Sequence, residues 1–173
     1  YGYPVDEWPE GIGTAAELPP FVPAGPQGLG DRQDSWPWAM QWWNDELYVG
    51  TNRAYRCVSL WSTHKFVRDL LPGLEKFFPY PGTDVDMDCT DEPQDLPMQA
   101  EIWRWSPEDS TWTLLFQSPN DVPNPDHPGH FLPRDSGFRS MAVHVESDGT
   151  EALYVAGINT RPMWDGPVPP PRI

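Results

Sequence analysis

One run of residues occurs twice in this chain, and this repeat limits the fold more than any other feature. The run from Asp34 to Met40 recurs from Asp135 to Met141, 101 positions later, with Asp, Ser and Met at matching places. In both copies an apolar segment, a polar turn and a second apolar segment follow, and the turn of the second copy contains Asp148-Gly149. Asp-Gly between apolar runs is a strong signal for a β-hairpin. The sequence therefore predicts the same hairpin twice.

Two further strand candidates lie between the copies. They cover residues 100–105 and 112–116, and the polar segment 106–110 joins them. The first hairpin and this pair give four antiparallel strands, and the second hairpin begins another such unit. Four antiparallel strands per repeat are typical of a propeller blade. We therefore expect the two hairpins to belong to successive sheets that pack face against face.

The wide spacing of the copies predicts a long insertion in the first unit. A blade usually takes about 40–50 residues, so most of the segment 52–99 is left over. Apolar residues at helical spacing between 58 and 78 predict a short helix or two there. The predicted fold class is all-β: about one and a half four-stranded antiparallel blades of a β-propeller with a long, partly helical insertion. A small β-sandwich built from the same hairpins is the alternative.

The predicted organisation has three parts. Residues 1–33 form a Pro- and Gly-rich N-terminal arm that lies over another part of the molecule, and residues 34–133 form the first blade with its inserted loop. Residues 134–173 form the first half of a second blade and a Pro-rich tail. Because one and a half blades cannot close a ring, we expect further blades or partner chains to complete it. A start at Tyr1 predicts a processed or excised chain.

The charge balance narrows the range of partners. The chain has 26 acidic side chains against 11 Lys and Arg, and its formal net charge is −15. A surface this acidic repels phosphate backbones, so nucleic acid is not an expected partner. No apolar stretch of about 18 residues occurs, so no membrane span is expected. Abundant Trp, Tyr and Pro with very little Lys are typical of a secreted, extracellular protein.

Three segments carry a family resemblance. Trp38-Ala39-Met40, 47–51 and 100–104 resemble the blades of kelch-like and galactose-oxidase-type β-propeller repeat proteins. The resemblance covers residues 32–161 and implies the N-terminal part of such a protein, of the secreted bacterial or fungal type. The copper-ligand set of the galactose oxidases cannot be placed on this chain. The resemblance therefore implies a fold and no particular chemistry.

Charged residues flank the two hairpins at equivalent positions. Asp34 and Asp135 precede the first strands, and Arg53 and Arg161 follow the second strands. These residues predict either one structural salt bridge per unit or a set of charges at the mouth of a propeller channel, where ligands bind. The complete set predicted at the channel mouth is Asp34, Trp38, Arg53, Asp135, Arg139 and Arg161.

An acidic run follows the region expected to be helical. Its carboxylates alternate along the chain, an arrangement that suits Ca²⁺, which binds six to eight oxygens. A solvated acidic loop without a metal is the alternative. The predicted ligands are Asp84, Asp86, Asp88 and Asp95.

The chain has two cysteines, Cys57 and Cys89, which enclose 31 residues. Their even number and the composition of the chain predict a disulfide. A disulfide would support an oxidising compartment. Two buried free thiols are the alternative.

Three classes of function fit these features. The leading prediction is a non-catalytic secreted interaction or scaffold module, because the sequence carries no nucleophile elbow, phosphate-binding loop, zinc-protease motif or dinucleotide fingerprint. The second is a carbohydrate-binding module, in which the faces of paired Trp residues stack on sugar rings. The third is a segment of a propeller enzyme whose catalytic residues lie outside this chain.

Overall fold

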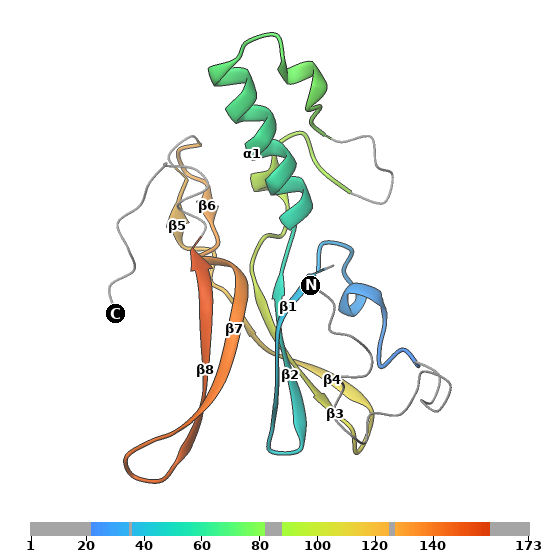
Figure 1. The fold of residues 1–173 in the computed structure, drawn as a ribbon, viewed down its shortest axis with the longest axis vertical. Coiled ribbons are helices and arrows are strands. Elements are labelled where there is room, and N and C mark those ends of the chain that lie inside the picture. Colours follow the sequence, from blue (N-terminus) through green and yellow to red (C-terminus); the bar gives the residue numbers. More distant parts are fainter. Residues whose placement is uncertain (1–21, 35, 82–87, 125–126, 160–173) are drawn as a thin grey trace, which may run out of the picture.

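The computed structural model describes residues 22–34, 36–81, 88–124 and 127–159 (Figure 1). Most of the regular structure in these residues is antiparallel β-sheet, and one α-helix projects beyond the strands. This confirms the β-rich fold class and the partly helical insertion. None of the described helices is both long and apolar enough to cross a lipid bilayer.

Four strands form an antiparallel meander in which each strand pairs with the next along the chain. The turn between the first two strands places Asn44 and Asp45 at φ 52° and 60°. Positive φ at both central residues matches the twist of a tight hairpin, and Asn and Asp tolerate it better than most residues. The strands are β1 (Trp36–Trp43), β2 (Glu46–Asn52), β3 (Glu101–Ser106) and β4 (Thr111–Gln117).

The second copy of the repeat forms the long hairpin of β7 (Asp135–Val145) and β8 (Glu151–Asn159). Its turn has Gly149 at φ 85°, where a side chain would be strained. The carboxylate of Asp148 accepts hydrogen bonds from the backbone N–H and the hydroxyl of Thr150, at 2.9 and 2.7 Å. The Asp-Gly signal therefore locates this turn correctly.

The expectation that the two hairpins belong to separate sheets is wrong. Six strands form one sheet, because the pair Asn52–Gly137 joins β2 to β7. There the start of β7 lies between the ends of β2 and β3. The carbonyl of Ser136 accepts a hydrogen bond from the N–H of Arg53 at 3.3 Å, and the carbonyl of Asp135 accepts one from the N–H of Ala100 at 3.0 Å. β2 and β3 separate at this point, and β7 accepts hydrogen bonds from backbone groups that would otherwise be buried without a partner.

Beyond that junction, the second hairpin packs on the face of the first sheet. Gly50 makes this contact close: a Cβ there would lie 2.7 Å from the Cβ of Phe138 and 2.9 Å from the Cε of Met141. The ring of Phe138 is buried and lies 5.9 Å from the ring of Phe116 on β4. Glycine at this position of β2 therefore lets β7 approach the sheet face to face.

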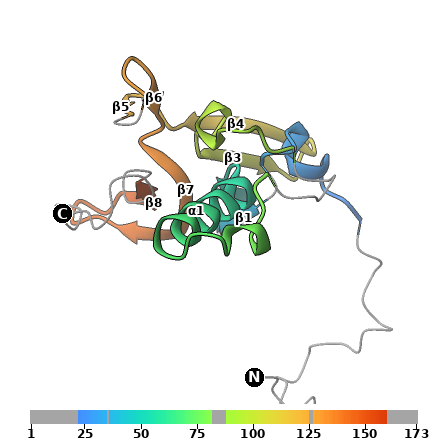
Figure 2. The same cartoon turned by 90° about the horizontal axis from the view of Figure 1, so that it is seen from above.

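The insertion between β2 and β3 contains helix α1 (Tyr55–Leu70) and two short 3-10 helices, η3 (Glu75–Phe77) and η4 (Pro93–Asp95). Viewed from above, α1 stands over β1, with β3–β4 and β7–β8 on different sides of it (Figure 2). Two short paired strands, β5 (Val122–Pro123) and β6 (Phe131–Leu132), lie near the base of the helix. A small apolar core joins these parts and consists of Ala54, Val58, Met98 and Leu132.

Candidate functional site

A buried group of charges lies where β2 ends. The side chain of Arg53 is 6% exposed, and its Nη1 lies 3.1 Å from Oε1 of Glu101, whose side chain is 7% exposed. Nη2 of Arg53 pairs with the carboxylate of Asp31 in the N-terminal arm. One guanidinium thus bridges two carboxylates from two different parts of the chain. Buried charges need such partners, because removal from water penalises an isolated ion.

Glu101 is held by neutral donors as well as by Arg53. Its Oε2 accepts a hydrogen bond from the indole Nε1 of Trp103, and its Oε1 accepts one from Nε2 of Gln117, both at 2.8 Å. Its backbone N–H donates to the hydroxyl of Thr51 at 3.2 Å. The carboxylate is therefore fixed in position and orientation by β2, β3 and β4 together.

Asp34 lies in the same region but forms no ion pair with Arg53. The residue is 3% exposed, and neither carboxylate oxygen has a partner at good hydrogen-bond geometry among the described residues. Burial raises the pKa of Asp34 to about 7; the Thr51 hydroxyl and the Arg53 charge lower this pKa, whereas the Glu101 carboxylate raises it further. A carboxyl with such a pKa exchanges its proton near neutral pH, which is common at functional sites.

An apolar cavity of about 290 Å³ lies beside Asp34. It lies between the arm on one side and the β1–β2 face on the other, is partly open to solvent, and has Trp112 of β4 in its wall. Thr51 and Asp34 are polar members of its wall, and the apolar side chains that line it are Leu29, Pro37, Met40, Leu47, Val49 and Trp112. A mostly apolar cavity with a few polar groups is the usual form of a small-molecule site.

The predicted channel-mouth residues occupy different places. Asp34 and Arg53 lie in the buried polar region, but Arg53 forms its ion pairs with Asp31 and Glu101 and none with Asp34. Asp135 lies near the β2–β7 junction, where its backbone N–H donates to the Ser118 hydroxyl at 2.8 Å. Burial raises the pKa of the Asp135 carboxyl, and the Ser118 hydroxyl lowers it in part. Arg161 lies outside the described residues.

Trp38 and Arg139, two of the residues predicted at the channel mouth, lie close together. The guanidinium carbon of Arg139 lies 5.5 Å from the centre of the Trp38 ring. Trp36 and Tyr55 extend this aromatic cluster, with their ring centres 4.7 Å apart. The indole of Trp36 is partly exposed at the surface, so the cluster presents one aromatic ring to the solvent.

The predicted calcium ligands are divided between described and undescribed parts of the chain. Asp84 and Asp86 lie outside the described residues. Asp88 is exposed and Asp95 closes the short helix η4. Within the residues that the structure describes, no three His, Cys, Asp or Glu side chains gather closely enough to hold a metal ion. Calcium binding by the acidic run stays a prediction.

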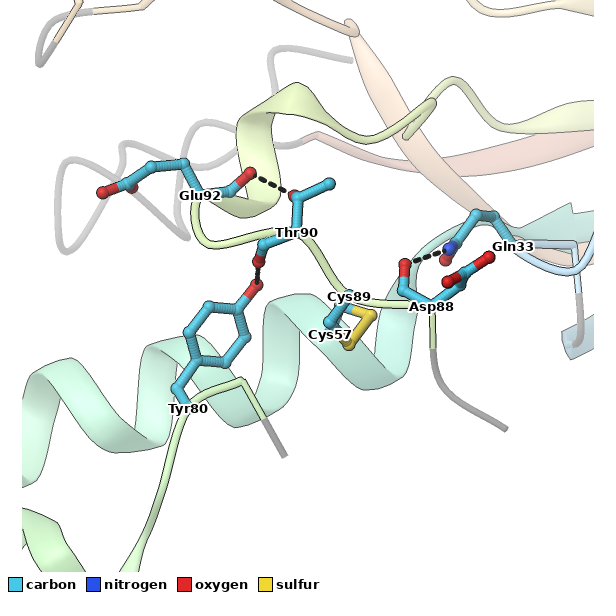
Figure 3. The surroundings of a disulfide bond; sticks show 7 residues. All are labelled: Gln33, Cys57, Tyr80, Asp88, Cys89, Thr90 and Glu92. Carbon is cyan, nitrogen blue, oxygen red and sulfur yellow. Dashed lines mark hydrogen bonds between the residues drawn. A yellow bond between two sulfur atoms is a disulfide. The ribbon is translucent and has the colours of Figure 1, made fainter. Parts of the chain in front are cut away.

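The predicted disulfide is present and joins Cys57 of α1 to Cys89, with the two Cα atoms 5.4 Å apart (Figure 3). Next to it, Nε2 of Gln33 in the arm donates a hydrogen bond to the carbonyl of Asp88 at 2.8 Å. On the other side, the hydroxyl of Tyr80 donates to the carbonyl of Thr90 at 2.6 Å. The disulfide therefore ties the acidic segment to the first turn of the helix and, through Gln33, to the arm.

Two of the surfaces that are open to solvent in the described residues bear on function. The first is the side of the β7–β8 hairpin that faces away from Gly50, and we call it the open hairpin face. It consists of Ser140, Ala142, His144, Tyr154 and Ala156, all exposed. The second lies at the far end of α1 and around η3. We call it the apolar tip, and its exposed members are Phe66, Leu70, Leu71, Leu74, Phe77 and Phe78.

Comparison of the chain with protein-family models, with curated proteins and with solved structures found no match.

Sequence reasoning missed the two carboxylates that pair with Arg53 and the cavity beside them. Glu101 could have been predicted as a site residue, because strand alternation places it on the same face as Trp103, where a buried carboxylate requires a partner. No sequence pattern points to Asp31, because it lies in the arm and approaches Arg53 only when the arm folds back over the sheet. The cavity has no sequence signal either, because its walls come from the arm, β1, β2 and β4.

Proposed function

We propose that this chain is a non-catalytic interaction module of the blade-repeat kind, in which the open hairpin face receives a further sheet of the same kind. The observation that carries the proposal is the exposure and composition of that face. Two of its members, Ala142 and Ala156, have short side chains, so another sheet can approach them closely. Beside them lies the ring of Tyr154, which is 55% exposed, and exposed apolar side chains of this kind often mark an interface.

The packing already seen within the molecule supports this proposal. β7 approaches β2 at a position without a side chain, Gly50, and fills the space with Phe138. The second hairpin already packs on the face of the meander β1–β4 around Gly50, which supports the idea that a further sheet can stack in the same way. Stacking of another sheet on the open hairpin face would repeat the same step. A propeller built in this way requires further blades, supplied by the same protein or by partner chains.

Self-association of residues 1–173 tests the proposal. With the further sheet absent, we expect two copies to cover each other's open hairpin face, so size-exclusion chromatography with light scattering should show a concentration-dependent dimer. Ala156→Arg places a charge on this face and should give a monomer. Thr63→Arg introduces the same charge at an exposed position of α1 and should leave association unchanged.

Two results would count against the proposal. One is a wild-type chain that remains monomeric at every concentration. The other is association that persists in Ala156→Arg and disappears in Phe77→Ser, because the interface would then be the apolar tip. Circular dichroism of each variant shows whether it is folded.

A carbohydrate-binding function is the second candidate, and the aromatic cluster at the start of β1 favours it. The ring of Trp36 is partly exposed and is supported from behind by Tyr55 at 4.7 Å. A rigid, exposed indole provides a flat face for stacking on a sugar ring. We expect polysaccharides that bind there to quench Trp fluorescence in the wild type and not in Trp36→Ala. A flat response across a broad polysaccharide panel would remove this candidate.

We also propose that the protein functions outside the reducing cytosol. The support is the Cys57–Cys89 disulfide, since structural disulfides persist mainly in oxidising compartments.

A further inference from the structure

The apolar tip extends away from the rest of the molecule. Helix α1 begins just after β2 and carries the tip at its far end, clear of the strands (Figure 1). Three of the six side chains that form the tip are phenyl rings, and that of Phe77 belongs to a residue that is 68% exposed. Large apolar side chains that gather in contact with water often mark an interaction site. The tip is part of the insertion between β2 and β3, so it is separate from the open hairpin face.

Hydrogen bonds hold the tip in one shape. The ring Nδ1 of His64 on α1 donates a hydrogen bond to the carbonyl of Phe78 at 2.8 Å. The backbone N–H of Leu74 donates to the carbonyl of Leu71 at 3.1 Å, and the N–H of Phe77 donates to the carbonyl of Leu74 at 3.0 Å. The apolar side chains are therefore presented together at a projecting end of the molecule.

Positive charge gathers at the same end. Both lysines of the chain, Lys65 and Lys76, lie in this region. The Nζ atom of Lys65 lies 5.2 Å from the centre of the Trp61 ring, and that of Lys76 lies 5.2 Å from the centre of the Phe77 ring. Residues 64–78 carry three cations against two carboxylates, in a chain whose formal net charge is −15. The tip thus combines apolar side chains with cations, whereas the chain as a whole is acidic.

The two carboxylates near the tip already have partners. Oδ1 of Asp69 lies 3.3 Å from Nε of Arg68. Oε2 of Glu75 accepts a hydrogen bond from the backbone N–H of Gly73 at 2.5 Å. Within the described part of the chain, neither lysine forms an ion pair with a carboxylate. The two ammonium groups are therefore available to an anion outside the molecule.

The acidic segment is held away from the tip. The Cys57–Cys89 disulfide fixes Asp88 and Cys89 beside the first turn of α1. From Cys57 to Leu70 the helix rises about 20 Å, at about 1.5 Å per residue. The Debye length at physiological ionic strength is about 8 Å, so charges this far apart are largely screened from each other. A negatively charged surface in contact with the tip is therefore attracted by the lysines and repelled only weakly by the acidic segment.

We propose that the apolar tip inserts into the surface of a lipid bilayer that contains anionic lipids. Its phenyl and leucyl side chains lie among the acyl chains, and Lys65 and Lys76 reach the phosphate groups. A long lysine side chain can keep its charge among the headgroups while its stem packs on apolar neighbours. Apolar burial and attraction to anionic headgroups together give such a contact its affinity. A soft bilayer can close around a projecting end, whereas a protein partner would need a preformed, acidic concave site.

Co-sedimentation with lipid vesicles tests the proposal. We expect residues 1–173 to pellet with vesicles of mixed phosphatidylglycerol and phosphatidylcholine, and to stay in the supernatant with vesicles of phosphatidylcholine alone. Binding should weaken as the salt concentration rises, because salt screens the attraction. Lys65→Gln and Lys76→Gln should each weaken binding by about fivefold. Phe77→Ser removes a ring from the inserted part and should weaken binding by about tenfold or more.

Two matched variants serve as controls. Phe131→Ser removes a ring that is also exposed, at 50%, but lies on β6 and outside the tip. Arg134→Gln removes an exposed cation outside the tip. Both should leave vesicle binding unchanged, and circular dichroism shows whether each variant is folded.

Three results would overturn the proposal. The first is a wild-type chain that stays in the supernatant with the anionic vesicles, which would leave a protein partner as the occupant of the tip. The second is equal binding to vesicles of phosphatidylcholine alone, because the lysines would then have no part in it. The third is a folded Phe77→Ser variant that pellets as the wild type does.

Discussion

Phe138→Ala tests whether the second hairpin packs on the first sheet as described. Phe138 is 5% exposed, and its Cβ lies over Gly50. Truncation of a buried Phe to Ala costs about 3–5 kcal/mol, because apolar burial is lost and a cavity remains. Its aromatic neighbour Phe116 is itself 45% exposed, so one side of this contact is close to water. We therefore expect the lower end of the range, about 3 kcal/mol.

The measurement is the midpoint of thermal unfolding. In a domain of this size, 1 kcal/mol changes Tm by about 2–4 °C, so Phe138→Ala should lower Tm by about 6–12 °C. Phe77→Ala removes the same ring from the apolar tip, where the residue is 68% exposed. An exposed substitution of this kind should change stability by no more than about 0.5 kcal/mol. If the two variants unfold at the same temperature, Phe138 is not buried between β7 and the sheet.

Three further predictions follow from individual contacts. Gly50→Ala brings a Cβ within 2.7 Å of the Phe138 Cβ, and overpacking of this kind should cost about 1–3 kcal/mol in denaturant unfolding. Replacement of both Cys57 and Cys89 by Ala should cost about 3–4 kcal/mol, the loop-entropy value for the 31 residues they enclose, measured against the oxidised wild type. The pKa of Asp34 is raised from 3.8 to about 7, so between these pH values the folded chain holds a proton that the unfolded chain has lost. The free energy of unfolding should therefore fall as pH rises from 3.8 to about 7. Unfolding curves of Asp34→Asn across this range should lack this fall.

The repeated hairpin could be read from the sequence because its signals are local. The turn residues Asn44-Asp45 and Asp148-Gly149 fix the two hairpins, and alternating apolar residues fix the strands around them. The length of the first strand of the second copy was less predictable, because β7 begins at Asp135, the residue that was expected to precede it. The first residues of β7 pair with β8 and, at Gly137, with β2, and the pairing with β2 is a long-range contact without a local signal.

The candidate site was only partly foreseeable. The repeat places Trp38 and Arg139 at equivalent positions, and the tertiary structure brings their side chains together. The partners of Arg53 could not be found in the same way, because Asp31 and Glu101 occupy no repeated positions. Ion pairing depends on which groups are brought together when the arm folds back, and charge patterns along the chain do not determine that.

The sequence by itself determined the elements: two hairpins, the strand pair between them, the helical insertion and the disulfide all depend on turn chemistry, periodicity and the number of cysteines. The tertiary structure alone decided which surfaces meet. The single β2–β7 link, the packing of Phe138 on Gly50 and the unpaired Asp34 beside the cavity depend on contacts between residues far apart in the chain. Such contacts are selected by the close packing and hydrogen-bond satisfaction of the whole fold, and no local pattern encodes them.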